Sequence, residues 1–120
     1  MLVPRITKEE LKARLDAPDP SSHPTILDAR LKYPYEHSTV RLPGAIRVAP
    51  GTLDQVQFPR DRDIVAYDSD PDEITSRALA VALLGQGYRV SVLKGGIAEW
   101  MGANLPVEAK DAPKPAAAKG

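Results

Sequence analysis

Residues 64–73 read IVAYDSDPDE, and this stretch decides how the chain folds. Four residues without polar alternation, Ile-Val-Ala-Tyr, run directly into four carboxylates and a proline. A continuous apolar segment of this length is typical of a strand buried on both faces of a parallel sheet. The helical pattern EITSRALAVALLGQGY follows at residues 73–88, and we expect that helix to end at Gly85 or Gly87. The order strand, acidic turn, helix predicts a β-strand feeding directly into a covering helix.

Short apolar segments and helical segments alternate through the rest of the chain. Thr7, followed three residues later by Glu10, has the spacing of a capping box and predicts the start of a first helix. Further strands are expected at residues 25–29, 45–49 and 89–93, and a last helix at residues 95–104. This order predicts an α/β fold with a mostly parallel sheet. Functional groups in such folds lie in loops at the carboxyl ends of the strands, which points to the loop that begins at Asp68.

The composition limits the classes of partner. Sixteen basic and sixteen acidic residues cancel, whereas a nucleic-acid or anionic-membrane surface needs a basic excess. No apolar run approaches the roughly 20 residues of a membrane span, and the first residues lack the pattern of a signal peptide. We therefore expect a cytoplasmic domain with no nucleic-acid partner and no membrane insertion.

The last stretch, AKDAPKPAAAKG at residues 109–120, contains no large apolar residue. Such a segment cannot bury a hydrophobic face, so it is expected to be a disordered tail or linker. The predicted domain is therefore residues 1–108. The chain also contains no cysteine, which excludes disulfides, thiolate zinc sites and cysteine nucleophiles.

Capping chemistry predicts roles for most of the acidic turn. Asp70 suits a helix N-cap, Pro71 the first helical position, and Glu73 the third position of a capping box, with Asp72 favoured by the helix dipole. Asp68 is not explained in this way, because it stands at the tip of the strand and faces the helix N-terminus. That position suits an anion, so Asp68 either caps the turn a second time or occupies the position of a nucleophile.

Four motifs in order give the chain, over about residues 5–108, a resemblance to the rhodanese-like domain family. The first motif is an Asp-x-Arg strand end, and the second places Tyr-Glu before a turn of the type Ile-Pro-Gly-Ala. The third is an apolar strand and tyrosine followed by the loop from Asp68, and the fourth combines Gly-Gly, Trp and Pro-Val. The matching residues outside the loop are Asp28, Arg30, Tyr35, Glu36, Leu42, Pro43, Gly44, Ala45, Gly95, Gly96, Trp100, Pro106 and Val107.

This resemblance implies a sulfurtransferase scaffold, a small parallel sheet with helices on both faces. Members of the family move a sulfane sulfur from thiosulfate or a similar anionic donor through a cysteine persulfide, without a cofactor. The resemblance implies that the loop of Ser69, Asp70, Pro71, Asp72 and Glu73 forms a cradle of backbone N–H groups around the nucleophile. A thiolate at a helix N-terminus has a lowered pKa and is nucleophilic, which fits that role. The possible rim of the site comprises Arg30, Lys94, Gly95 and Gly96.

The chain departs from the family at the position of the catalytic cysteine, which carries Asp68. One subgroup has Tyr-Cys-Ser-Cys-Pro in this loop, so Tyr67-Asp68-Ser69-Asp70-Pro71 has aspartate at both cysteine positions. A carboxylate cannot carry a persulfide, and its charge repels an anionic donor. We therefore expect no sulfurtransferase turnover, whether the aspartates are natural or introduced.

Three other functions remain open. Asp68 and Asp70 resemble the nucleophile and acid of a haloacid-dehalogenase phosphatase, but the chain has few carboxylates downstream to hold magnesium. Alternating Asp68, Asp70 and Asp72 form a candidate weak cation site, although Pro71 and the missing glycine turn disfavour a calcium loop, and we expect no metal. The third is a non-catalytic module that binds a protein partner through the loop or its rim.

Two ion pairs are also expected near the loop. Arg30, which follows Asp28, should make a structural ion pair, with Glu36 as a candidate partner. Lys94 immediately precedes Gly95-Gly96, so it should face the loop and pair with Asp68.

Overall fold

A five-stranded parallel sheet forms the centre of the computed structural model, which describes residues 2–49, 57–69 and 72–110. Its strands, in spatial order, are β1 (Arg5–Ile6), β6 (Val90–Leu93), β5 (Ile64–Tyr67), β2 (Thr25–Asp28) and β4 (Ile46–Arg47). Every pairing in this sheet is parallel, and β5 lies at its middle, with Ile64 opposite both Thr25 and Val90. A separate antiparallel pair joins β3 (Val40–Arg41) to β7 (Glu108–Ala109).

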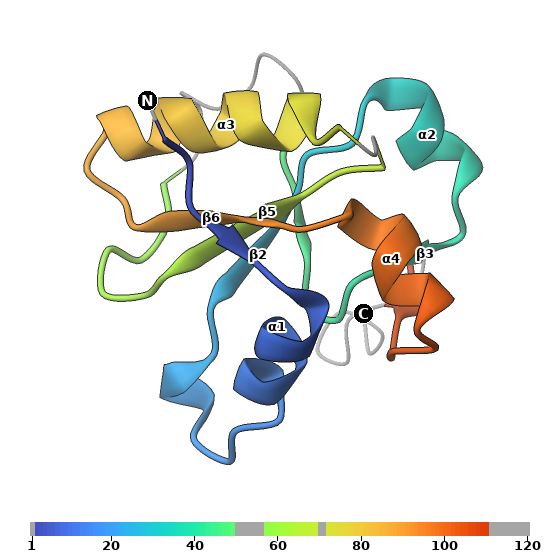
Figure 1. Cartoon of the computed structure of the whole chain (residues 1–120), viewed down its shortest axis with the longest axis horizontal. Coiled ribbons are helices and arrows are strands. Elements are labelled where there is room, and N and C mark those ends of the chain that lie inside the picture. Colours follow the sequence, from blue (N-terminus) through green and yellow to red (C-terminus); the bar gives the residue numbers. More distant parts are fainter. Residues whose placement is uncertain (1, 50–56, 70–71, 111–120) are drawn as a thin grey trace, which may run out of the picture.

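Helices cover both faces of the sheet, as the resemblance implies (Figure 1). Helix α3 (Ile74–Gly85) lies on one face, while α1 (Lys8–Leu15) and α4 (Gly96–Gly102) lie on the other. A short helix, α2 (Lys32–His37), follows β2, and a single 3₁₀ turn occupies Pro20–Ser22. The expected α/β architecture is confirmed.

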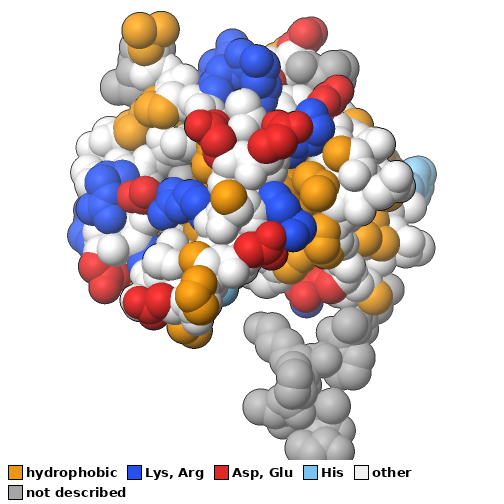
Figure 2. Space-filling view, turned by 60° about the horizontal axis from the view of Figure 1, so that its bottom comes forward, with side chains coloured by type: hydrophobic (Ala, Val, Ile, Leu, Met, Phe, Trp, Pro, Cys, Tyr) orange, Lys and Arg blue, Asp and Glu red, His pale blue; other side chains and the backbone are white. Residues whose placement is uncertain are grey.

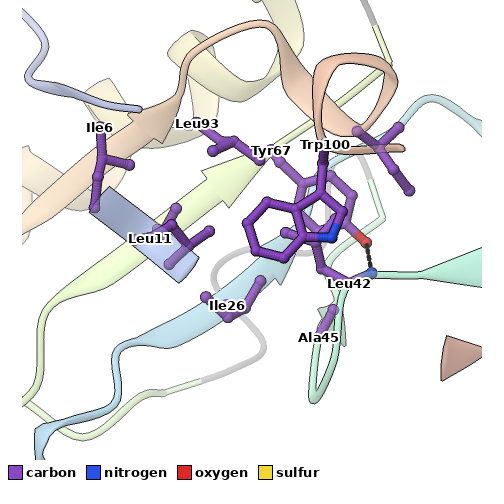
Figure 3. Packing of buried hydrophobic residues seen from close by; sticks show 10 residues of the cluster. Ile6, Leu11, Ile26, Leu42, Ala45, Tyr67, Leu93 and Trp100 are labelled. Carbon is purple, nitrogen blue, oxygen red and sulfur yellow. Dashed lines mark hydrogen bonds between the residues drawn. The ribbon is translucent and has the colours of Figure 1, made fainter. Parts of the chain in front are cut away.

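The central strand β5 is buried on both faces, as its lack of polar alternation predicts. Ile64 and Ala66 pack with Leu83 of α3, whereas Val65 and Tyr67 join the opposite cluster. That second cluster brings together residues from α1, α4 and the sheet, around the fully buried Trp100 (Figure 3). Side chains alternate between the two faces of a strand, so one short strand serves both halves of the core.

The predicted capping box of α1 and the predicted end of α3 are confirmed, and one short helix is not predicted. The Thr7 hydroxyl accepts from Glu10 N at 3.1 Å while the Glu10 carboxylate accepts from Thr7 N at 2.9 Å, so the capping box is present. Helix α3 ends at Gly85, as expected. Helix α2 is absent from the sequence-based prediction, and its Pro34 stands in the first turn, where proline is tolerated.

The folded region extends two residues beyond the predicted boundary at 108. Ala109 belongs to β7 and pairs with Val40, and Lys110 N donates to Thr39 O at 2.8 Å. Backbone pairing thus orders two residues next to the predicted boundary, although they have no large apolar side chain to bury. The remaining predicted tail, residues 111–120, lies outside the described residues. Within the described ranges, no helix is both long and apolar enough to span a bilayer.

Candidate functional site

Asp68 follows β5 directly and lies at the carboxyl edge of the sheet, where the sequence placed it. The residue is 1% exposed, and its Oδ2 atom accepts a hydrogen bond from Ser76 N at 2.6 Å. Ser76 is the third residue of α3, so this N–H is one of the donors that a helix leaves unpaired at its N-terminus. The carboxylate thus occupies the anion position at the start of α3.

The backbone of Asp68 is held by a second helix start. Its carbonyl oxygen accepts from Ile97 N at 3.0 Å, in the first turn of α4. Gly96, with φ +63°, lies directly against this carbonyl: a Cβ atom there would stand 2.3 Å from Asp68 O. Gly96 therefore lies against the loop, and only glycine fits at position 96, while the predicted role of Gly95 and Gly96 as a site rim stays a prediction.

The predicted capping of α3 is wrong. The helix begins at Ile74 and not near Asp70, and Glu73 is its N-cap residue, with a left-handed φ of 59° and no side-chain capping bond. Asp72 precedes the helix and is exposed, while Asp70 and Pro71 lie outside the described residues. The physical reason is that the Asp68 carboxylate already accepts a hydrogen bond from the N-terminus of α3. The side chain of Glu73 is therefore free to bind Arg5 instead.

The Glu73 carboxylate is buried and anchors the end of the loop to two distant segments. It accepts from Arg5 Nε at 2.9 Å and Nη2 at 2.5 Å, and from Gly95 N at 3.2 Å, with Arg77 Nη2 at 3.9 Å. Burial raises the pKa of the Glu73 carboxyl, but the Arg5 and Gly95 hydrogen bonds and the nearby charges outweigh it, so the pKa lies below its usual value. Sequence reasoning missed Arg5, since no local signal links residues 68 positions apart.

A cleft of about 420 Å³ opens beside this anchor. Its lining residues are Arg5, Thr7, Lys8, Glu9, Glu73, Lys94, Gly95 and Glu99. Lys94 is exposed in this lining, and among the described residues it makes no ion pair with Asp68, so that expectation is wrong. Acidic and basic side chains lie next to one another on the face seen in Figure 2, and Lys8 pairs with Glu99 at 3.1 Å.

Arg30 is part of the structural core and not of an open rim. It is 1% exposed, and its Nη2 and Nε atoms lie 2.6 and 2.9 Å from the two carboxylate oxygens of Asp28. The guanidinium also donates to Val40 O at 3.0 Å. The ion pair is therefore made with Asp28 and not with Glu36, because the carboxylate two residues back satisfies the guanidinium bidentately without leaving the interior.

The remaining loop residues give no metal centre in the part of the chain that is described. Within those residues, no three His, Cys, Asp or Glu side chains lie together as ion ligands. The candidate cation triad includes Asp70, which lies outside the described residues, so that hypothesis stays a prediction. Ser69 is half-buried beside Asp68.

Comparison with known proteins identifies the class of domain that this fold and loop define. The sequence matches the family model described as the rhodanese-like domain over residues 7–103. This match spans most of the chain, so the protein belongs to the rhodanese-like domain family, which is typically associated with sulfurtransferase activity.

Solved structures share the fold. The Alr3790 protein from Anabaena sp. is 31% identical, with a TM-score of 0.70 over 88% of this chain and 83% of that one. A protein from Lactobacillus plantarum superposes with a TM-score of 0.76 at 22% identity, covering 87% of each chain. A rhodanese-related protein from Thermoplasma volcanium gives 0.66 at 22% identity, over 88% of this chain and 97% of that one. No curated protein gave a match.

Proposed function

We propose that this chain is a rhodanese-like domain of the sulfurtransferase type in which Asp68 stands at the position of the nucleophile and abolishes persulfide chemistry. One observation carries the proposal: the buried Asp68 carboxylate accepts the Ser76 N–H at the N-terminus of α3. In an active relative, that electropositive position would stabilise a thiolate and its persulfide. Here the chain supplies its own anion.

The chemistry that is lost can be written out in two steps. A thiolate attacks the sulfane sulfur of thiosulfate, the sulfur–sulfur bond breaks, and sulfite leaves with the electron pair. A second nucleophile, such as cyanide, then takes the sulfur and regenerates the thiolate. The cysteine sulfur is the nucleophile in the first step and the leaving group in the second, and the chain contains no cysteine. The fixed charge of Asp68 would also oppose the approach of a dianionic donor.

A second candidate function is a non-catalytic module that binds a protein partner. The filled anion position favours it, because a loop that carries its own ligand keeps its shape without substrate. Asp68 is held through both its carboxylate and its carbonyl, and Glu73 is anchored to β1 and to Gly95. The expectation of a cytoplasmic location stays a prediction.

The test is thiocyanate production from thiosulfate and cyanide by the Asp68→Cys variant. Asp68→Ser is the matched control, since it removes the same charge and offers a hydroxyl of similar size without a sulfur nucleophile. Turnover by Asp68→Cys alone would support the sulfurtransferase scaffold with an absent nucleophile.

Two other results have distinct meanings. If the folded Asp68→Cys protein is inactive, the loop is not a competent cradle and the binding-module function is favoured. If the parent chain itself produces thiocyanate, the proposed role of Asp68 is wrong.

A further inference from the structure

Several cationic groups surround the ring of Tyr35, at the opposite edge of the sheet from β1. The guanidinium carbon of Arg47, at the end of β4, lies 4.1 Å from the ring centroid, and Lys110 Nζ lies 4.3 Å from it. Arg30 lies farther away, at 5.4 Å, and its charge is already paired with Asp28. Cations within about 6 Å of an aromatic ring are attracted to its face. Cationic side chains from three separate segments of the chain therefore lie near the Tyr35 ring.

The hydrogen bonds of Arg47 and Lys110 leave these charges without a carboxylate partner among the described residues. Arg47 Nη1 donates to the carbonyl oxygens of Asp28 and Arg30, at 3.2 and 2.5 Å. Lys110 Nζ donates to the carbonyl oxygen of Tyr35 at 2.6 Å. Many other cations of the protein do face a carboxylate, namely Arg5, Lys8, Lys12, Arg14, Arg30, Arg41, Arg77 and Arg89. Carbonyl groups orient a cation but do not neutralise it.

A cleft of about 400 Å³ gives access to this cluster. Lys32, Tyr35, Glu36, Arg47 and Ala49 line it. Lys32 is exposed on the wall, and Arg47 is half-buried between the ring and the carbonyl oxygens, which fixes its orientation. Glu36 contributes one exposed carboxylate to the lining, against the two cations Lys32 and Arg47, and Lys110 adds a third positive charge at the Tyr35 ring.

We propose that this cleft, separate from the Asp68 loop, binds a tetrahedral oxyanion group such as phosphate or sulfate. Only Nη1 of Arg47 is hydrogen-bonded within the described part of the chain, so Nε and Nη2 remain to donate to an oxyanion in the forked geometry that arginine offers. Lys32, exposed in the same lining, is a second donor.

The protein itself offers a matched control. Arg60 also stacks on a tyrosine, with its guanidinium carbon 4.2 Å from the Tyr88 ring centroid, and it also donates to a carbonyl oxygen, that of Gln86. Among the described residues no other cation lies over the Tyr88 ring, so Arg60→Gln changes a similar local contact outside the cluster. Lys32→Gln removes a positive charge from the cleft lining without breaking a hydrogen bond among the described residues, and it keeps the test valid if Arg47→Gln fails to fold.

The experiment is an NMR titration of the full chain with inorganic phosphate at constant ionic strength. We expect saturable shifts of amide resonances around Tyr35 and Arg47, with binding weakened about tenfold in Arg47→Gln and clearly weakened in Lys32→Gln. Arg60→Gln should bind as the parent does. Absence of saturable shifts, or equal losses in all three variants, would overturn the proposal.

A parallel titration with phenyl phosphate distinguishes two sources of the same group. Tighter binding of the monoester than of phosphate would assign the cleft to a phosphate carried on a larger molecule. Tighter binding of free phosphate would assign it to the inorganic anion.

Discussion

Two buried carboxylates, those of Asp68 and Glu73, bound the loop between β5 and α3. The two carboxylates have different hydrogen-bond donors. Asp68 accepts from the N-terminus of α3, and Glu73 accepts from Arg5 and the Gly95 N–H. Buried carboxylates are tolerated only when they are hydrogen-bonded or paired, so these contacts are conditions for the loop conformation. Glu73 additionally adopts a left-handed backbone conformation, which is unfavourable for a residue with a Cβ atom.

The backbone strain at Glu73 can be separated from the loss of its side chain. Glu73→Ala and Glu73→Gly both remove the carboxylate, but only glycine adopts φ 59° without a steric cost. We expect Glu73→Gly to be more stable than Glu73→Ala by about 1 kcal/mol, measured by urea unfolding. Equal stability of the two variants would show that residue 73 is not held in the left-handed conformation.

The lowered pKa of Glu73 predicts how stability depends on pH. A carboxyl with a lower pKa in the folded state stabilises the fold fully above its ordinary value of about 4.3, and this contribution is lost as the pH falls through the lowered value. Glu73→Gln should cost about 1–3 kcal/mol at neutral pH and should reduce the loss of stability on acidification.

Unfolding free energies at neutral pH and near pH 3 test this expectation. The exposed Glu36→Gln variant is the control and should lose stability on acidification as the parent does. A residual acid dependence in Glu73→Gln is expected from Asp63, whose pKa is lowered chiefly by its hydrogen bond with Arg89. Identical acid dependence in Glu73→Gln and the parent would contradict the assignment.

At the scale of the element, the sequence predicts the type of the main strands and helices but not the start of α3. Apolar runs and capping spacing locate β5 and α1 because these signals are local. The start of α3 depends on Asp68, which reaches the helix from the preceding strand, and on Arg5, which is distant in sequence. Local capping rules then assign Asp70 and Glu73 to positions that the structure does not support.

The start of α4 against Asp68 gives a prediction for a single methyl group. Gly96→Ala places a Cβ atom 2.3 Å from Asp68 O at φ +63°, so Asp68 or α4 must shift. We expect a loss of about 2 kcal/mol or more in urea unfolding.

The last residue of α3 provides the control for that substitution. A Cβ atom at Gly85 meets nothing within 4 Å, so Gly85→Ala should be neutral or slightly stabilising. If Gly96→Ala is as stable as Gly85→Ala, the close approach of α4 to Asp68 is absent in solution.

At the scale of the whole molecule, the sequence predicts the architecture but not the C-terminal strand β7 that completes the domain. Alternating strands and helices define the parallel α/β sheet, and the ordered motifs indicate the family. β7 pairs with β3, and Lys110 contacts Tyr35, over separations of about 70 residues. The residues involved carry only weak local signals for secondary structure. Composition alone therefore does not predict this pairing.

Truncation tests how far the fold extends. A chain ending at Lys110 should unfold with the free energy of the full chain, because the removed residues carry no large apolar side chain. A chain ending at Val107 loses the β3–β7 pairing, the Arg41–Glu108 ion pair and the Lys110 contacts, and should lose about 1–2 kcal/mol. Equal stability of both truncations would show that β7 does not belong to the domain.

The central claim is that residue 68 lies at the nucleophile position and that a cysteine there would be enough to restore persulfide formation. Intact-protein mass spectrometry tests it most directly. The Asp68→Cys variant is incubated with thiosulfate, separated from excess thiosulfate, and its intact mass is measured. Asp68→Ser and the parent chain are treated in the same way as controls. We predict that Asp68→Cys alone gains the mass of one sulfur atom and that a reductant removes it. An unchanged mass for a folded Asp68→Cys protein would contradict the account, because the loop would then be unable to activate a thiolate even when one is supplied.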